Sequence, residues 1–577
     1  MKQFMHRKLL AMGTMIVLSI TVVCWCIHEE RSETFAISGI GLKTQNGDVR
    51  ILPLRCGEDA EWDLFFPAGI SSDQYRFELE NGIELEIDGK SYENGDSFFA
   101  FSQHAESMVT LRHKGRLIEQ GVLRLHQAEQ VDSLMLTISG GGSLEKVNKD
   151  LTKKTSVYVE FQAMFSDGTL AEHGRCLFGG RGNHTWAVED VSYKKPYKLT
   201  MDDAQTLFGM NEARKWTLLA NTFDDTYIRN HLAFEAARRL DCACVPQDEF
   251  VNLYVDGEYQ GLYQLTQKVD MDGGILDEHA DEGMLLEFNT EGWEGENEIT
   301  FYSPDKYVSI VSPEVLDQEQ YDATVEEICS IEKAIKRKDD TYRGMLEADS
   351  WMKQYLLHEV FVNKDVDFSS TFFYKSSDND KWRAGPLWDF DRTFGLPEYT
   401  LRYNGTEQYV TWIQGMTTGY KVNAGWYKAL YENPSFQEGV KRLYLDKFFH
   451  ITQSLIEEYI PALQKELALS VRMDHIRHRL DPARQSKGVA RLSQWLQNRS
   501  LFLREFWSDE TQYIQVTFYT REIEDNSHDM VCYVKPGTSL EHFPDADIIV
   551  KWKSEDGTEI TESHVFYEDT TVYPVTI

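Results

Sequence analysis

Cysteine is scarce in this chain of 577 residues, which carries only 8. Two of them, Cys24 and Cys26, belong to an apolar N-terminal run, and the other six are dispersed over some 550 residues. Such usage excludes a disulfide scaffold. Cys242 and Cys244 are separated by one residue, which is not the C-x-x-C spacing of redox or zinc sites. We therefore expect structural cysteines, and the 42% of apolar residues suffice for packed cores.

Positive charge is also in short supply. The chain has 59 basic against 94 acidic residues and a net charge of −35. This balance argues against nucleic acid and against an anionic lipid surface as partners. Short-period repeats and low-complexity tracts are absent too. A chain of this length is expected to hold several domains.

One long apolar run occurs, near the N-terminus. Lys2, Arg7 and Lys8 precede nineteen apolar or small residues, 9–27. That length can span a bilayer, and basic residues before it place the N-terminus in the cytoplasm. The run exceeds the usual signal-peptide core and no A-x-A site follows it. We interpret residues 1–35 as a cytoplasmic tip and membrane anchor, with a cleaved signal peptide as the alternative.

The rest of the chain changes character three times. Residues 36–130 contain short strand patterns separated by Asn-Gly and Asp-Gly turns, which indicate a small all-β, sandwich-like domain. Residues 131–510 alternate strand and helix patterns and become helical from about 426 to 507. Residues 511–577 return to strands. The fold class is therefore multidomain α+β. Within the central part we expect helices at 226–240, 314–337 and 352–362, strands at 157–165 and 371–375, and a hairpin of 250–255 with 261–266.

The most informative motif is the tetrapeptide Trp388, Asp389, Phe390 and Asp391. If it is extended, both carboxylates lie on one face and both rings on the other. Two carboxylates that close are unfavourable unless a cation lies between them. Mg²⁺ suits such oxygen ligands and often binds together with nucleotide phosphates. A solvated acidic turn is the alternative.

A glycine-rich loop at 179–186 holds Arg181 and Asn183, and Lys198 follows on an expected strand. Such loops let backbone N–H groups approach phosphates, and nearby cations complement the charge. Kinases grip nucleotide phosphates with a loop followed by a strand lysine. An ordinary turn is the alternative, with Arg181 in a structural salt bridge. Glu235 could pair with Lys198, as kinases pair a strand lysine with a helix glutamate.

Further candidates lie at the ends of expected strands and helices. Lys268 and Glu287 end strand-like segments and could reach a cleft, although an exposed hairpin explains them equally well. Asp365 lies between a helix and a strand, 24 residues before Asp389. It could orient or deprotonate a hydroxyl while the later pair holds a metal. Asp367 competes for that role, and a plain loop acid is the alternative for either.

Together these segments resemble the spore-coat protein H (CotH) kinase family over roughly residues 131–450. The resemblance is carried by RGNHTW at 181–186, KPYK at 195–198, FGM at 208–210, KWTLLAN at 215–221, RN at 229–230, GEYQGLY at 257–263 and GPLWDFDRTFG at 385–395. One departure is His184, where the family usually has Ser. The flanking region 36–130 resembles the β-rich part that often precedes this domain, and 511–577 resembles β-grasp repeats of bacterial surface proteins.

The resemblance implies an atypical kinase with a reduced kinase-like core, which uses ATP and Mg²⁺ or Mn²⁺ to phosphorylate Ser/Thr of extracellular or spore-coat proteins. It implies Asp365 and Asp389 as catalytic residues and Asp389 with Asp391 as metal ligands, although which of this pair chelates stays open. The expected nucleotide-binding residues are Arg181, Asn183, Lys198, Lys268 and Glu287.

We therefore expect a membrane-anchored kinase with an extracytoplasmic ectodomain and a protein substrate. A secreted or spore-coat protein is the alternative location. Another class is a non-catalytic surface scaffold or adhesin that keeps a pseudokinase nucleotide cleft. A glycoside hydrolase using Asp365 and Asp389 is a third reading, and it leaves the glycine loop and Lys198 unexplained.

Overall fold

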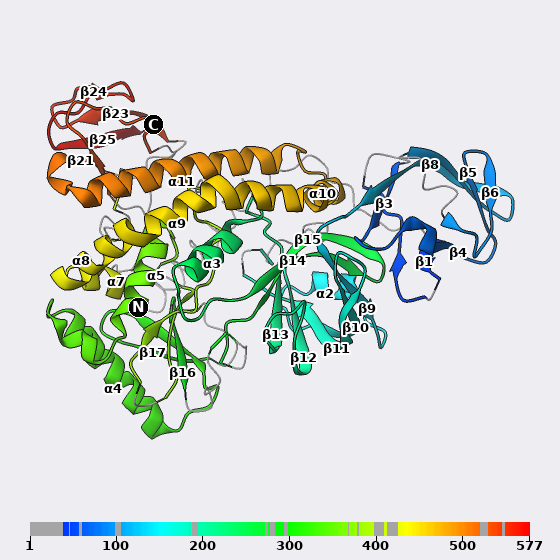
Figure 1. Ribbon diagram of the computed structural model, residues 1–577, viewed down its shortest axis with the longest axis horizontal. Coiled ribbons are helices and arrows are strands. Elements are labelled where there is room, and N and C mark those ends of the chain that lie inside the picture. The colour runs from blue at the N-terminus through cyan, green and yellow to red at the C-terminus, as the bar shows by residue number, and fades with distance from the viewer. Residues whose placement is uncertain are drawn as a thin grey trace, which may run out of the picture.

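A computed structural model of the chain shows several β-sheets and a large helical region (Figure 1). It describes residues 39–45, 47–56, 61–98, 106–183, 185–186, 194–271, 275–276, 283–292, 298–366, 369–377, 380–396, 409–411, 413, 425–519, 529–544 and 548–576. The expected anchor at 1–35, His184 and Asp367 lie outside these residues. Across the described ranges, no helix combines the length and apolarity needed to cross a bilayer.

The N-terminal part consists of two sheets that share one hydrophobic core. The smaller sheet has the order β2 (Arg50–Ile51), β1 (Ile40–Thr44) and β4 (Tyr75–Leu79). The larger has the order β3 (Glu61–Phe66), β8 (Arg116–Gln127), β7 (Glu106–His113), β5 (Ile83–Ile87) and β6 (Lys90–Tyr92). The strands expected here are present, and a backbone hydrogen bond from Leu52 N to Gly257 O (2.9 Å) joins this part to the next.

The next part is a closed barrel, drawn in cyan and green in Figure 1. Its strand order is β10 (Ser156–Met164), β11 (Leu170–Gly180), β12 (Tyr197–Gln205), β13 (Ala213–Leu219), β15 (Glu258–Gln267), β14 (Asp248–Val255) and β9 (Asp132–Ile138). The β14–β15 hairpin confirms the expected one, since Asp256 and Gly257 both have the positive φ that a tight two-residue turn requires. The parallel pairing of β9 with β14 closes the barrel.

A second five-stranded sheet follows the barrel. Its order is β17 (Ile299–Tyr302), β18 (Tyr307–Ser312), β16 (Met284–Asn289), β19 (Thr371–Lys375) and β20 (Arg383–Ala384). The helices around it are α3 (Arg229–Arg239), α4 (Gln318–Ile335) and α5 (Ala348–Phe361), preceded in the barrel region by the short α2 (Leu144–Lys149). Helix α4 begins at a capping box of Asp317 and Gln320, and α5 ends at Val362 in the left-handed conformation.

The part of the chain from Gly425 on is helical and ends in a small sheet (Figure 1). Its helices are α7 (Gly425–Tyr431), α8 (Pro434–Leu443), α9 (Phe449–Ser454), α10 (Ile460–His478) and α11 (Arg484–Ser508), with π-helical turns at Tyr444–Phe448 and Leu455–Tyr459. Short 3₁₀ turns occur at Ser72–Gln74, Asp340–Gly344 and Glu510–Gln512. The final sheet has the order β22 (Met530–Val534), β21 (Ile514–Phe518), β25 (Thr570–Thr576), β23 (Ile549–Ser554) and β24 (Glu559–Ile560).

One large core joins the helical region, the second sheet and the C-terminal sheet. Helix α10 is also fixed to the barrel by a buried carboxylate, that of Asp474. Its Oδ1 accepts a hydrogen bond from Leu262 N of β15 (2.8 Å) and lies 2.8 Å from the Lys194 ammonium. Its Oδ2 accepts one from the Tyr227 hydroxyl (2.6 Å). These contacts therefore hold helix α10 against the barrel.

Candidate active site

Residues 385–396, which we call the acidic segment, follow β20 and form no strand. Asp389 has φ 63°, so the expected extended backbone with alternating faces is wrong. The reason is tertiary: the Phe390 backbone N–H donates to Asn230 Oδ1 of α3 at 2.6 Å, where a strand neighbour would otherwise be needed. A left-handed residue cannot continue a pleated strand.

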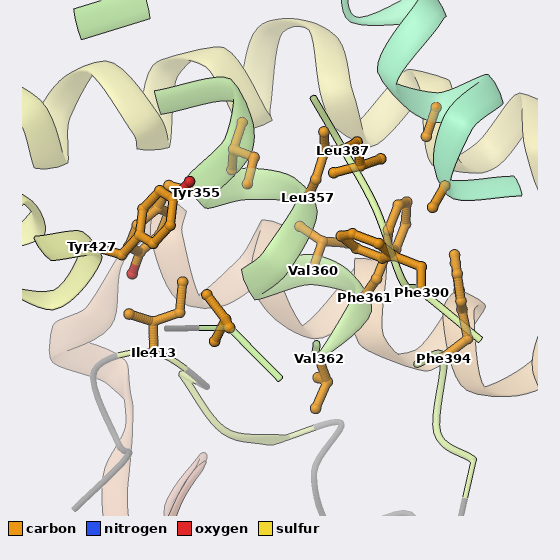
Figure 2. Packing of buried hydrophobic residues seen from close by; sticks show 14 of the residues in the cluster. Tyr355, Leu357, Val360, Phe361, Val362, Leu387, Phe390, Phe394, Ile413 and Tyr427 are labelled. Atoms are coloured by element: carbon orange, nitrogen blue, oxygen red, sulfur yellow. The ribbon is translucent and has the colours of Figure 1, made fainter. Parts of the chain in front are cut away.

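The two aromatic rings of the tetrapeptide still anchor it, but on two different helices. Trp388 stacks on Phe234 of α3, with ring centroids 6.4 Å apart. Phe390 is fully buried and stacks on His358 of α5 at 5.2 Å. Figure 2 shows Phe390 beside Phe361 of α5 in this apolar cluster. The anchoring leaves Asp389 and Asp391 half-buried on the segment between the two helices.

The carboxylates expected in the site do share one space. Burial and the neighbouring charge of Asp389 raise the pKa of Asp391 well above its ordinary value. The charges of Asp365 and Asp224 raise it further, while Arg392 opposes them. The charges of two predicted residues, Asp365 and Asp389, thus both act on the third, Asp391. Such an excess of negative charge suits a bound cation.

Asp365 lies in the turn that follows α5. The left-handed Val362 ends the helix and redirects the chain, and Asp365 N then donates to Asn363 Oδ1 at 2.9 Å. The Ser369 backbone N–H donates to Asp365 O at 3.2 Å. The Asp365 side chain is half-buried. Both the backbone N–H and the backbone C=O of Asp365 are therefore hydrogen-bonded.

Arg181 faces the acidic segment from the end of β11. Its guanidinium lies 5.8 Å from the centroid of the Trp388 ring. Burial lowers the pKa of Arg181, and the charges of Asp389 and Asp391 oppose that shift. The structure thus places the Arg181 guanidinium where the charges of Asp389 and Asp391 act on it.

Lys198 lies on the strand beside Arg181, since β12 pairs it with Gly179 of β11. A third cation, Lys153, was not predicted from the sequence. Burial lowers the pKa of Lys153, and the charges of Lys198 and Arg181 lower it further, so the three cations are neighbours. Lys153 Nζ donates to Gly182 O (2.8 Å) and to Asn183 Oδ1 (3.1 Å), which holds the glycine loop in place.

The charge of Asp389 acts on Glu287 of the second sheet, and so does that of Lys268, which follows β15 of the barrel. Burial raises the pKa of Glu287 to about 8, with Glu298 and Asp389 adding to the rise. A hydrogen bond from a backbone N–H and the charge of Lys268 act in the opposite direction. Lys268 is exposed, and its Nζ lies 3.7 Å from Asp270 Oδ2. Glu287 therefore lies near Asp389, Lys268 lies near Glu287, and their roles stay predictions.

Other details differ from expectation. Glu235 forms ion pairs with Arg238 (3.1 Å) and Arg239 (2.7 Å) on its own helix, in place of the suggested pair with Lys198. Ser370 contacts both Glu287 and Asp389. No pattern in the sequence singled out Lys153 or Ser370, because each reaches the site only through the tertiary fold.

The donor set fits a hard divalent cation, because Asp389 and Asp391 offer carboxylate oxygens in a space with surplus negative charge. Among the described residues, no group of three or more His, Cys, Asp or Glu side chains makes up a metal site. Mg²⁺ is commonly held by one or two carboxylates and completes its coordination with phosphates and water. A two-carboxylate site beside cations that attract phosphate agrees with that pattern.

Comparison with known proteins gives a family. The family model "CotH kinase protein" matches residues 180–503, which is more than half of the chain. Nothing among curated proteins matches. The crystal structure of the Golgi casein kinase aligns at 11% identity over 66% of this chain and 75% of its own, with a TM-score of 0.22. On the family match, the chain belongs to the CotH kinase protein family.

Proposed function

We propose that this protein transfers the γ-phosphoryl group of ATP to Ser or Thr hydroxyls of a protein substrate. One observation carries the proposal: a cationic group on the barrel faces a carboxylate group on the helical side. Arg181 is close enough to be affected by the charges of Asp389 and Asp391. Phosphoryl transfer needs little covalent chemistry from the protein and depends on positioning and charge neutralisation.

The cations would bind the nucleotide phosphates. Arg181 is held against Trp388, and Lys198 is fixed by its strand pairing with Gly179. Asn183 lies on the loop between them and would approach the same phosphates. A buried guanidinium makes strong charge-assisted hydrogen bonds with phosphate oxygens. Lys268 would add charge at the rim.

The carboxylates would divide between proton handling and metal binding. Asp365, whose backbone is hydrogen-bonded on both its N–H and its C=O, would orient the acceptor hydroxyl and take its proton. Asp389 and Asp391 would hold Mg²⁺ or Mn²⁺, with Glu287 beside them. Bound metal would supply neutralisation of the charge on the transferred group.

In this proposal the protein acts as two kinase-like lobes. The barrel with its glycine loop would bind the nucleotide, and the helical region would supply the acidic residues. A protein in which an N-terminal anchor holds the site outside the cytoplasm is our proposal for location. It rests on the basic residues and the apolar run at 9–27. The substrate would then be a surface or coat protein.

The test uses the full chain in detergent with labelled ATP and Mn²⁺ or Mg²⁺, and follows self-labelling and labelling of a protein acceptor. We expect metal-dependent transfer that Asp365→Asn and Asp389→Ala abolish. Asp380→Asn, which changes an exposed acid in the β19–β20 connection, is the matched control and should retain it. Nucleotide binding without any transfer would refute catalysis and favour the scaffold. Equal transfer by all four proteins would reject the assigned residues.

A further inference from the structure

Ser370 joins two acidic residues of the site that belong to different parts of the fold. Its backbone N–H donates to Glu287 Oε1 of β16 at 2.7 Å. Its hydroxyl donates to Asp389 Oδ2 at 3.3 Å. One small residue thus connects a carboxylate of the second sheet with a carboxylate of the acidic segment.

The two ends of this connection differ in rigidity. Ser370 directly precedes β19, and the pairing of Thr371 with Phe288 and of Phe372 with Glu287 fixes it relative to β16. Asp389 lies outside any strand and has a left-handed backbone. Its neighbours Trp388 and Phe390 are anchored by packing, but packing of neighbours does not set the rotation of the Asp389 carboxylate.

That rotation decides whether Asp389 can bind a metal. Among the described residues, the Asp389 carboxylate accepts its hydrogen bond from the Ser370 hydroxyl. The hydroxyl contacts Oδ2, so this hydrogen bond leaves Oδ1 available as a metal ligand. Groups that orient a ligating carboxylate commonly change metal affinity by 10- to 100-fold when they are lost.

We propose that Ser370 is a positioning residue, which takes its own place from the β16–β19 pairing and holds the Asp389 carboxylate in the orientation that binds the divalent metal. The inference rests on the proposed function, since it assumes that Asp389 is a metal ligand. It adds a residue outside the acidic motif and gives Glu287 a second role, as the acceptor that fixes the Ser370 backbone.

The test is Mn²⁺ affinity of the full chain, measured by the electron paramagnetic resonance of free Mn²⁺ with a non-hydrolysable ATP analogue present. Ser370→Gly removes the hydroxyl and suits the residue's φ of 55°. We expect it to weaken Mn²⁺ binding about 10-fold. Ser370→Asn tolerates the same backbone and offers an amide donor, and it should stay within about 3-fold of wild type.

The matched control is Ser369→Ala, at the neighbouring serine, whose hydrogen bonds in the described residues involve its backbone. It should bind Mn²⁺ as wild type does. Wild-type affinity in Ser370→Gly would overturn the inference, and so would an equal loss in Ser369→Ala. Asp389→Ala separates the two hypotheses: if wild type binds Mn²⁺ and Asp389→Ala binds it equally, the metal site itself is wrong. If Asp389→Ala loses binding and Ser370→Gly keeps it, only the role of Ser370 fails.

Discussion

Breaking the buried ion pair between Glu359 of α5 and Arg499 of α11 is the stability test that the structure defines best. Both side chains are fully buried. Arg499 Nη2 donates to Glu359 Oε1 and to Glu359 O, each at 2.8 Å. Its Nη1 donates to Val410 O, while Glu359 Oε2 accepts from Ile413 N at 2.7 Å. The pair therefore holds the chain downstream of the acidic segment against two helices.

The expected cost follows from what each substitution leaves behind. Arg499→Met leaves the Glu359 carboxylate in the core without its guanidinium partner, while the Ile413 N–H still donates to it. Removal of one partner of a buried pair costs about 3–5 kcal/mol of unfolding free energy. The double substitution Glu359→Met with Arg499→Met removes both charges, and replacing a buried pair by apolar groups is often nearly neutral. Here we expect a residual cost of about 1–3 kcal/mol, because the backbone groups of Val410 and Ile413 lose partners.

The assay is urea unfolding of the full chain followed by tryptophan fluorescence, with hydrogen exchange of the Ile413 amide as a local readout. The control is Arg504→Met on the same helix. Arg504 is exposed and stacks on Phe449 at 4.5 Å, so its loss should cost about 1 kcal/mol or less. A cost for Arg499→Met no larger than that of Arg504→Met would refute the reasoning. A double variant less stable than Arg499→Met alone would refute it as well.

Three further predictions concern other groups. Asp474→Asn should lower the unfolding free energy by about 3–5 kcal/mol in urea at pH 7, because it leaves the buried Lys194 ammonium without its anion. Burial raises the pKa of Asp474, but the Lys194 charge and the carboxylate's other partners together outweigh burial and lower this pKa to about 2. The stabilisation by the Asp474 carboxylate is therefore present above pH ~4 and lost as the pH falls toward 2. The pKa of Glu287 is raised to about 8, so ionisation of this carboxyl destabilises the folded chain as the pH rises from 5 to 8. Glu287→Gln should therefore reduce the fall of the thermal unfolding midpoint over that pH range. A midpoint that falls as steeply as in wild type would contradict this prediction. Lys153→Met should weaken ATP binding roughly tenfold in calorimetry, because Lys153 adds positive charge beside Arg181. Lys153→Arg keeps the charge and should keep most of the ATP affinity. Equal ATP affinity in the two variants would refute a role for the Lys153 charge.

Local patterns in the sequence predicted local structure well. The helix expected at 314–337 is α4, and that expected at 352–362 is α5. The hairpin with the Asp256-Gly257 turn is also confirmed. In these segments, side-chain periodicity and turn chemistry depend on neighbours in the sequence, and so they can be read from it.

The features that were not predicted are set by contacts between residues far apart in the sequence. The backbone of the acidic segment is set by a hydrogen bond from Phe390 N to Asn230, 160 residues away in sequence. Closure of the barrel requires β9 to pair with β14, more than a hundred residues later. Lys153 likewise reaches Arg181 only because β10 and β11 are adjacent. The motifs thus supplied candidate site residues, whose roles stay predictions, but they did not predict the conformation of Asp389 or the positions of Lys153 and Ser370.

The central claim is that the barrel cations and the carboxylates of the acidic segment hold one metal–nucleotide complex. Anomalous diffraction from crystals of the full chain grown with Mn²⁺ and a non-hydrolysable ATP analogue tests it most directly. We predict one Mn²⁺ peak within coordination distance of Asp389 or Asp391, with phosphate density contacting Arg181 and Lys198. Nucleotide bound elsewhere, or Mn²⁺ held away from both carboxylates, would contradict the account.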